Sequence, residues 1–213
     1  RYQMQYETKD IFVVSIKENS DILIYKNHSI VFFKRKGHWH FLNFCSLMDT
    51  IHAYFGAEER PYDEEDIGLT LIDMLLKQSG CCLGIIKRDV WSRHFEKTRL
   101  GSADVFLSMA PSVSRCFWGN TRTVRQKMLS IDGAVLVLAE TGDLLSVGSI
   151  IQHDGNASQG ARTTAAKKIA ALGGMAIKVS DDGYCEIYLP PSVGSPELLK
   201  DFTRIKPSFQ IGK

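Results

Sequence analysis

Two short groups of residues in the second half of the chain carry side chains suited to binding a divalent cation or a phosphate. Asp132 and Gly133, followed by Ala134, stand where a predicted helix gives way to an apolar strand. A carboxylate at such a point could bind a divalent cation or receive a hydroxyl, and glycine lets a ligand approach the backbone. An aspartate that caps a turn at the end of a strand would give the same sequence. Both interpretations of Asp132 stay open at this stage.

The second group reads Gly-Ala-Arg-Thr-Thr-Ala-Ala over residues 160–166 and lies where a polar loop enters an alanine-rich helix. The start of a helix offers backbone N–H groups and the positive end of the helix dipole, which favour phosphate binding. Arg162 could add a bidentate grip, and the hydroxyls of Thr163 and Thr164 could donate hydrogen bonds. A capped helix with Arg162 in solvent is the alternative. The candidate binding residues of this group are Gly160, Ala161, Arg162, Thr163 and Thr164.

Hydrophobic patterning predicts an α/β domain that would position both groups. Residues 81–86 form a continuous apolar run, which is typical of a central strand covered on both faces. Residues 131–139 and 144–151 read as strands joined by a turn, and therefore as a hairpin. Helices are predicted over residues 63–78 and 122–130 and up to residue 172, and further strands over residues 175–180 and 184–189. Strands that bracket helices in this way predict a mixed central β-sheet flanked by helices.

The front of the chain has a different pattern, and three parts are expected. Residues 1–60 form a β-rich N-terminal part, with strands near residues 11–16, 22–25, 29–33 and 38–44 and a helix over 46–55. Residues 61–190 form the α/β domain, in which 87–119 are an irregular connection with short helical pieces, and residues 191–213 are a C-terminal tail. His38 and His40 share one face of a strand but lack a third ligand nearby, so exposed histidines are predicted there rather than a metal site.

Composition limits the classes of protein that fit. The sequence of 213 residues begins at Arg1 rather than at a methionine, so it is expected to be part of a longer chain. The hydrophobic fraction of 44% supplies a core, and the five cysteines, an odd number, favour a reducing, cytoplasmic setting. No run approaches the roughly 20 apolar residues of a membrane helix, so no membrane segment is expected. The net charge of +2 gives no strong nucleic-acid signal.

The order of these motifs resembles the diadenylate cyclase domain family, also called DisA_N or DAC. Members of that family carry Asp-Gly-Ala on a strand, then Gly-Thr-Arg-His-Arg-Ala-Ala at a helix entrance, then Val-Ser-Glu-Glu at a strand end. The likeness covers roughly residues 121–189, and a weaker one extends over residues 67–86. It implies an α/β domain in which two protomers meet face to face around two ATP molecules and a divalent metal to make cyclic di-AMP.

The resemblance also implies roles for individual residues. By position, Asp132 would be the metal or ribose-hydroxyl carboxylate, with Gly133 and Ala134 beside the nucleotide, while Arg162 would contact phosphate and Ser180 would lie near the phosphates. This chain departs from the family where it has Thr163 and Thr164 in place of a histidine and a second arginine, and where residues 181–182 are Asp-Asp in place of Glu-Glu. Losing a cation and an imidazole should cost several kcal/mol of transition-state stabilisation. Binding could survive where catalysis does not.

Three hypotheses about function follow. The first is a catalytically degenerate domain that binds and senses a nucleotide or cyclic dinucleotide, with assembly into a homo-oligomer as a possibility. The second is an active diadenylate cyclase that uses Asp132 as the catalytic and metal-binding carboxylate with Mg²⁺ or Mn²⁺, together with Arg162 and either threonine hydroxyls or His94. The third is a scaffold that keeps the fold solely for assembly.

Overall fold

The computed structural model describes ten segments of the chain. They are residues 11–17, 20–26, 29–55, 64–77, 79–96, 103–151, 160–181, 184–191, 203–205 and 208–212. The chain divides into two compact units, of which the first combines residues 1–44 with 208–213 and the second spans residues 45–207. The domain boundary expected at residue 60 lies outside the described residues, as does the chain directly after residue 191, so these boundaries stay predictions.

The first unit is an antiparallel sheet with the strand order β1-β2-β3-β4-β11. Its strands are β1 (Phe12–Ile16), β2 (Ile22–Lys26), β3 (Ser29–Arg35), β4 (His38–Leu42) and β11 (Ser208–Gly212). The first four strands confirm the β-rich N-terminal part, and the positive φ values of Lys36 and Gly37 close the turn between β3 and β4. The fifth strand comes from the predicted tail and pairs with β4.

The core of this unit includes polar side chains that hydrophobic patterning did not reveal. Arg35 and Asp21 form a buried ion pair with a distance of 3.0 Å between Nε and Oδ2. The prediction that His40 is exposed is wrong, because its ring is buried and stacks on Phe33 with 4.6 Å between ring centroids. An alternating strand pattern shows which residues share a face, but which face is covered depends on the rest of the fold.

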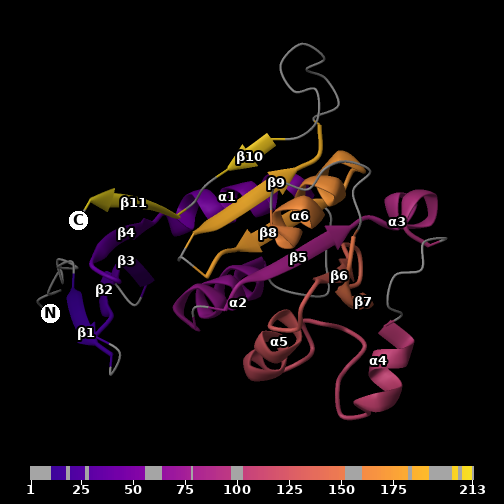
Figure 1. Ribbon diagram of the computed structural model, residues 1–213, viewed down its shortest axis with the longest axis horizontal. Coiled ribbons are helices and arrows are strands. Elements are labelled where there is room, and N and C mark those ends of the chain that lie inside the picture. The colour runs from indigo at the N-terminus through magenta and orange to yellow at the C-terminus, as the bar shows by residue number, and fades with distance from the viewer. Residues whose placement is uncertain are drawn as a thin grey trace, which may run out of the picture. The chain divides into compact units, whose positions relative to one another are not determined.

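The second unit is built on a mixed sheet with the strand order β10-β9-β8-β5-β6-β7 (Figure 1). Its strands are β5 (Cys81–Ile86), β6 (Ala134–Leu138), β7 (Leu144–Ser149), β8 (Met175–Val179), β9 (Cys185–Leu189) and β10 (Thr203–Ile205). Strands β5 and β6 are parallel, and the other neighbouring strands are antiparallel. This sheet confirms the predicted α/β class with a mixed central sheet, and β6 and β7 form the predicted hairpin.

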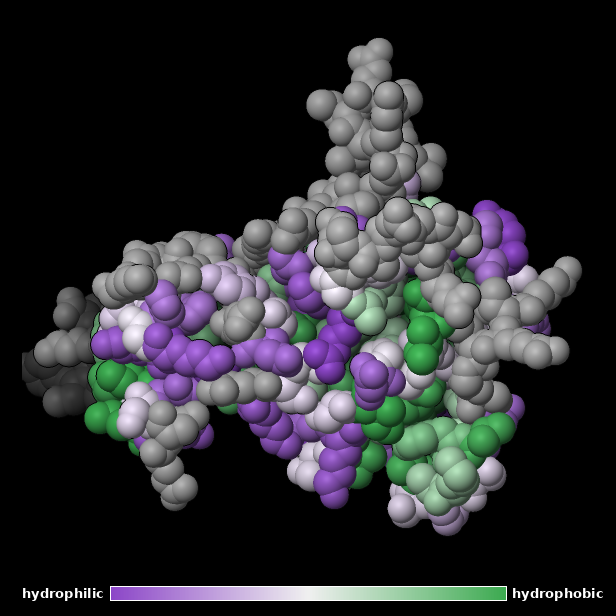
Figure 2. Space-filling view, in the orientation of Figure 1, coloured by the Kyte–Doolittle hydropathy of each residue, from purple (hydrophilic) through white to green (hydrophobic). Residues whose placement is uncertain are grey.

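Helices complete this unit. They are α1 (Phe44–Phe55, which starts at the unit boundary), α2 (Glu64–Lys77), α3 (Arg88–His94), α4 (Ala103–Met109), α5 (Arg122–Leu129) and α6 (Ala161–Ala171). Helices α3 and α4 fall within the predicted irregular connection. Val105 and Met109 of α4 are exposed, and Figure 2 shows apolar surface over this helix. No helix in the described segments has both the length and the apolar character needed to cross a membrane.

Helix α6 lies across one face of the sheet, over β5 and β8 (Figure 1). Ile169 of α6 belongs to the same buried cluster as Cys82 of β5 and Ala176 of β8. Because side chains alternate between the two faces of a strand, every second residue of β5 and β8 faces α6. A Cβ atom added at Gly84 would lie 2.6 Å from Leu136 Cδ2 and 2.9 Å from Ile169 Cδ1. Glycine in β5 therefore lets α6 approach the sheet closely. The residues on the other face of these strands are also buried, against α2 and α5.

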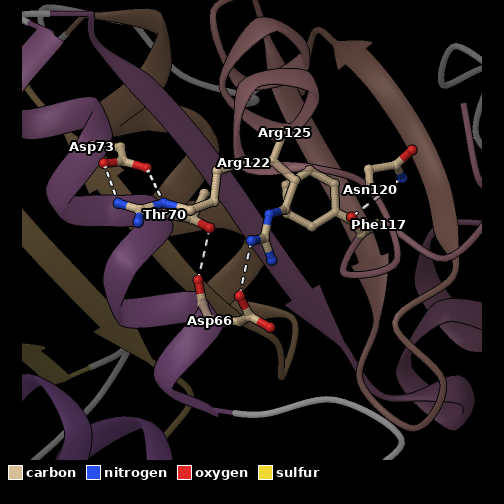
Figure 3. Close-up of polar contacts among 7 residues, drawn as sticks. All are labelled: Asp66, Thr70, Asp73, Phe117, Asn120, Arg122 and Arg125. Carbon is tan, nitrogen blue, oxygen red and sulfur yellow. Dashed lines mark hydrogen bonds and ion pairs between the residues drawn. The ribbon is translucent and has the colours of Figure 1, made fainter.

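Paired charges join α2 to α5 (Figure 3). Arg122 donates two hydrogen bonds to the carboxylate of Asp73, at 2.8 and 2.6 Å, and Nη2 of Arg125 donates to Oδ1 of Asp66 at 2.8 Å. The Thr70 hydroxyl donates to the backbone oxygen of Asp66 at 2.7 Å. Because α5 ends at Leu129, these contacts fix the helix that leads into the Asp-Gly-Ala motif.

The segment before α5 is ordered around one amide side chain. Nδ2 of Asn120 donates to the backbone oxygens of Ser114 and Cys116, at 3.0 and 2.8 Å. It also donates to the backbone oxygen of Phe117 at 3.3 Å, the contact that Figure 3 shows. Its Oδ1 accepts a hydrogen bond from the Ser114 N–H at 2.8 Å. Phe117 is fully buried and its N–H donates to the backbone oxygen of Gly142 at 2.8 Å, which ties this segment to the turn between β6 and β7.

Candidate functional site

The topology of the second unit brings the predicted site residues to one edge of its sheet. Parallel β5 and β6 start at the same edge, and antiparallel β8 ends there, since Val179 pairs with Cys81. Asp132 lies directly before β6, Ser180 lies directly after β8, and Arg162 lies in the first turn of α6 beside Gly80. This edge, defined by Gly80, Asp132, Arg162, Ser180 and Asp181, is called the Asp132–Arg162 edge below.

Arg162 is held at this edge by an acidic partner. Its Nη1 lies 3.6 Å from Oδ1 of Asp181, and the side chains of Arg162 and Asp181 are 30% and 65% exposed. The same Asp181 oxygen accepts a hydrogen bond from the Gly80 N–H. A Cβ atom at Gly80 would collide with both side chains. Nε of Arg162 is buried and has no hydrogen-bond partner within the described structure. Arg162 is therefore positioned over the start of β5 rather than extended into solvent.

The start of α6 has the predicted form of a helix entrance. Gly160 is the N-cap residue, with φ −56°, and no described side chain caps this end of the helix. The backbone oxygen of Gly160 accepts hydrogen bonds from the N–H groups of Thr163 and Thr164, at 3.0 and 3.1 Å. A Cβ atom at Gly160 would meet nothing within 4 Å. Ala161 is exposed, and both threonine side chains are half-buried.

Only the last residue of the Asp-Gly-Ala motif, Ala134, lies in the strand in which the whole motif was expected. Strand β6 starts at Ala134 rather than residue 131, because Gly133 has a φ of +101° that interrupts the extended chain. A Cβ atom at Gly133 would lie 2.6 Å from the carbonyl carbon of Gly148 and 2.9 Å from the backbone oxygen of Ser149. The close approach of β7 therefore requires glycine at this position, for a reason independent of any ligand.

The other two residues of this motif, Asp132 and Ala134, differ in whether a ligand could contact their side chains. The Asp132 carboxylate is exposed, and its Oδ1 accepts a hydrogen bond from the neighbouring Gly133 N–H at 3.0 Å. The local contact agrees with the turn-capping interpretation and leaves the carboxylate on the surface. The Ala134 side chain is fully buried, so a ligand at the surface could contact only the backbone of this residue.

Ser180 and a lysine missed by the sequence analysis lie on neighbouring positions of one sheet face. The Ser180 N–H donates to the backbone oxygen of Tyr184 at 2.7 Å and so closes the turn after β8. Lys178, two residues earlier, pairs with Cys82 in the β5–β8 register and lies on the face that α6 covers. Its Nζ lies 3.3 Å from Oε2 of Glu186, and its side chain is 18% exposed. In the sequence, the spacing of two residues between Lys178 and Ser180 could have indicated that both lie on the same face of the sheet.

The positive charges of Arg162 and Lys178 both act on the buried thiol of Cys82. Burial raises the pKa of the Cys82 thiol to about 12, and these two cations partly oppose that rise. Glu186, the partner of Lys178, also accepts a hydrogen bond from the Tyr188 hydroxyl at 2.8 Å. Arg162 and Lys178 each have a carboxylate partner, Asp181 and Glu186 respectively.

Apolar side chains flank the exposed carboxylate of Asp132. Ile131 is 39% exposed and Ile150 is 74% exposed. Ile131 precedes Asp132 directly, and Ile150 follows Ser149, the partner of Ala134 in the β6–β7 ladder. Because exposed isoleucines beside a carboxylate offer apolar surface, a flat ring could lie there while its polar substituents reach Asp132.

The described residues offer a divalent metal only part of a ligand set. No group of three or more His, Cys, Asp or Glu side chains among them could hold a metal ion. Mg²⁺ in phosphoryl-transfer sites is bound by one or two carboxylates together with the phosphates of the substrate. Asp132 fits that minimal role, with the ligand's phosphates supplying the remaining oxygens.

His94 lies too far away to complete the site within one chain. Helix α3 follows the end of β5, whereas the Asp132–Arg162 edge lies at the start of β5. Val90 of α3 lies near Gly173, directly after the end of α6, in agreement with this placement. Arg93 pairs with Asp89 of its own helix, at 3.0 Å.

The fold is thus a mixed α/β sheet domain together with a second, antiparallel sheet unit. Comparisons with protein-family models and with curated proteins find no match. Among solved structures, the chain is similar to a hypothetical membrane-spanning protein from Bacillus cereus, with 16% identity and a TM-score of 0.47 over 69% of this chain and 68% of the other. It is also similar to a double mutant of DacA from Staphylococcus aureus, with 13% identity and a TM-score of 0.37 over 66% and 83%. Both are distant structural likenesses.

Proposed function

We propose that the Asp132–Arg162 edge binds a nucleotide or cyclic dinucleotide, and that the chain is a catalytically degenerate diadenylate-cyclase-like domain that senses this ligand. One observation carries the proposal: a carboxylate, a guanidinium at a helix start and a serine turn come from separate segments of the sequence to one edge of the sheet. The order of motifs that resembles the diadenylate cyclase family supports the same assignment.

Each part of the edge suits a different part of such a ligand. The N–H groups at the start of α6 and the Arg162 guanidinium suit phosphate, and the Thr163 and Thr164 hydroxyls lie on the same turn. The exposed Asp132 carboxylate suits a ribose hydroxyl. The exposed Ile131 and Ile150 side chains offer apolar surface to a base.

The charges at the edge favour binding over catalysis. Adenylyl transfer develops negative charge that cations must neutralise in the transition state. Here Arg162 faces Asp181, and Lys178 faces Glu186, so neither cation brings an uncompensated positive charge. The alternative function is an active diadenylate cyclase, in which Asp132 and the substrate phosphates would hold Mg²⁺ or Mn²⁺.

Differential scanning fluorimetry with product analysis tests the proposal. The purified chain is titrated with ATP, GTP and a panel of cyclic dinucleotides, with and without Mg²⁺ or Mn²⁺, and each mixture is then analysed by mass spectrometry. A ligand at a hundred times its dissociation constant stabilises by about 2.7 kcal/mol, which corresponds to a rise in Tm of roughly 5–10 °C for a chain of this size. We expect such a rise without formation of cyclic di-AMP.

Two matched arginine variants locate the site. Arg162→Ala should abolish the rise in Tm, whereas Arg93→Ala, which removes a guanidinium at the opposite edge of the sheet, should leave it intact. Formation of cyclic di-AMP that is lost in Asp132→Asn would establish the enzyme instead. Absence of any rise across the panel, with a stable oligomer in light scattering, would leave the scaffold hypothesis.

A further inference from the structure

We infer that Asp181 is a specificity-determining residue that makes the Asp132–Arg162 edge favour singly charged phosphodiesters, such as those of a cyclic dinucleotide, over the triphosphate of ATP. The inference rests on the proposed function, because it concerns which ligand the same edge selects. It follows from the balance of charge around Arg162 rather than from the order of motifs.

The ion pairs around Arg162 do not suit a polyanion. Arg162 faces Asp181 and Lys178 faces Glu186, while the exposed carboxylate of Asp132 adds a further negative charge. A site for a triphosphate gains affinity from an excess of cations, because the ligand carries up to four negative charges. A phosphodiester carries one negative charge per phosphate and is repelled less by the same carboxylates.

Asp181 is the carboxylate that a phosphate would meet first. Its Oδ1 accepts the Gly80 N–H and lies 3.6 Å from Nη1 of Arg162, so it already engages two donors that a phosphate oxygen could use. A phosphate that binds Arg162 must therefore share these donors with Asp181 or displace it.

Displacement of Asp181 is inexpensive, but its charge stays nearby. The side chain is 65% exposed, and an exposed ion pair stabilises a protein only weakly. The displaced carboxylate would remain on the turn after β8, beside Arg162. Its repulsion grows with the charge of the ligand, so a triphosphate loses more affinity than a phosphodiester.

The test compares the dissociation constants of ATP, tripolyphosphate and cyclic di-AMP for the whole chain and two variants by isothermal titration calorimetry in EDTA at 0.1 M salt. Asp181→Asn removes the charge and keeps an oxygen that can accept the Gly80 N–H. Glu140→Gln is the matched control, because it also removes one negative charge. Glu140 lies in the turn between β6 and β7, at the edge of the sheet opposite the Asp132–Arg162 edge, and accepts a hydrogen bond from the Arg88 N–H. Circular dichroism confirms that each variant is folded.

We expect the parent chain to bind cyclic di-AMP more tightly than ATP. Asp181→Asn should strengthen binding of ATP and tripolyphosphate by about tenfold and of cyclic di-AMP by only about two- to threefold, because the repulsion scales with ligand charge. Glu140→Gln should change all three constants by less than about twofold. Tripolyphosphate has no base, so its gain isolates the contribution of charge.

The outcomes separate this inference from the proposed function. Binding by the parent with an equal gain for all ligands in Asp181→Asn, or with no gain, overturns the inference and leaves the proposed function standing. A parent that prefers ATP also overturns it. Triphosphate binding that appears only in Asp181→Asn supports it. Binding of no ligand by either protein overturns the proposed function, and the inference falls with it.

Discussion

Replacing Gly133 with alanine should destabilise the second unit by about 2–6 kcal/mol. The φ of +101° is a conformation that costs a residue with a side chain about 1–3 kcal/mol. The new Cβ atom would lie 2.6 Å from the carbonyl carbon of Gly148, so β7 must move, and such overpacking typically costs about 1–3 kcal/mol. Because whole domains are stable by only about 5–15 kcal/mol, the loss should be large.

Urea denaturation followed by circular dichroism measures this effect, and a loss of this size corresponds to a fall in Tm of roughly 4–24 °C. Gly160→Ala is the matched control at the other motif glycine, because its φ is −56° and a Cβ atom there meets nothing within 4 Å. It should cost less than about 1 kcal/mol, as expected of an N-cap change. If Gly133→Ala were as stable as the parent, the close approach of β7 would not explain this glycine, and a role in admitting a ligand to the backbone would become the better explanation.

Four further predictions concern thiols, pH, one amide and one surface ion pair. Burial raises the pKa of the Cys81 and Cys82 thiols to about 12, so a thiol reagent should modify them only after unfolding, whereas exposed Cys45 should react at once in a native titration. In the unfolded chain these two thiols ionise near pH 9, so stability should be retained below pH 9 and fall between about pH 9 and 12; a Cys81→Ala, Cys82→Ala double variant should show a smaller fall. Asn120→Ala should cost about 1–3 kcal/mol in urea denaturation, because it removes the side-chain partner of part-buried and buried backbone groups of Ser114, Cys116 and Phe117, and a loss below 1 kcal/mol would contradict that role. Arg122→Ala should cost at most about 1 kcal/mol, and 1 M NaCl should remove most of the difference from the parent.

Elements with a strong local pattern were predictable from the sequence. The strand over residues 81–86 matches β5, and the helix predicted over residues 63–78 matches α2 within one residue at each end. The hairpin of β6 and β7 and the helix entrance at Gly160 were also found. These features depend on hydrophobic period, turn residues and helix-start residues that lie within about ten positions of one another, so the sequence alone carries the signal.

Only the tertiary structure decided how these elements meet. The ionic partner of Arg162 is Asp181, on a different element, and Lys178 reaches the same sheet face through the register of β8 against β5. Strand β11 joins the first sheet from the far end of the chain. The need for glycine at Gly133 arises from β7, which follows it by more than ten residues. Strand pairing and side-chain contact between distant segments depend on the packing of the whole sheet, and local periodicity does not predict that packing.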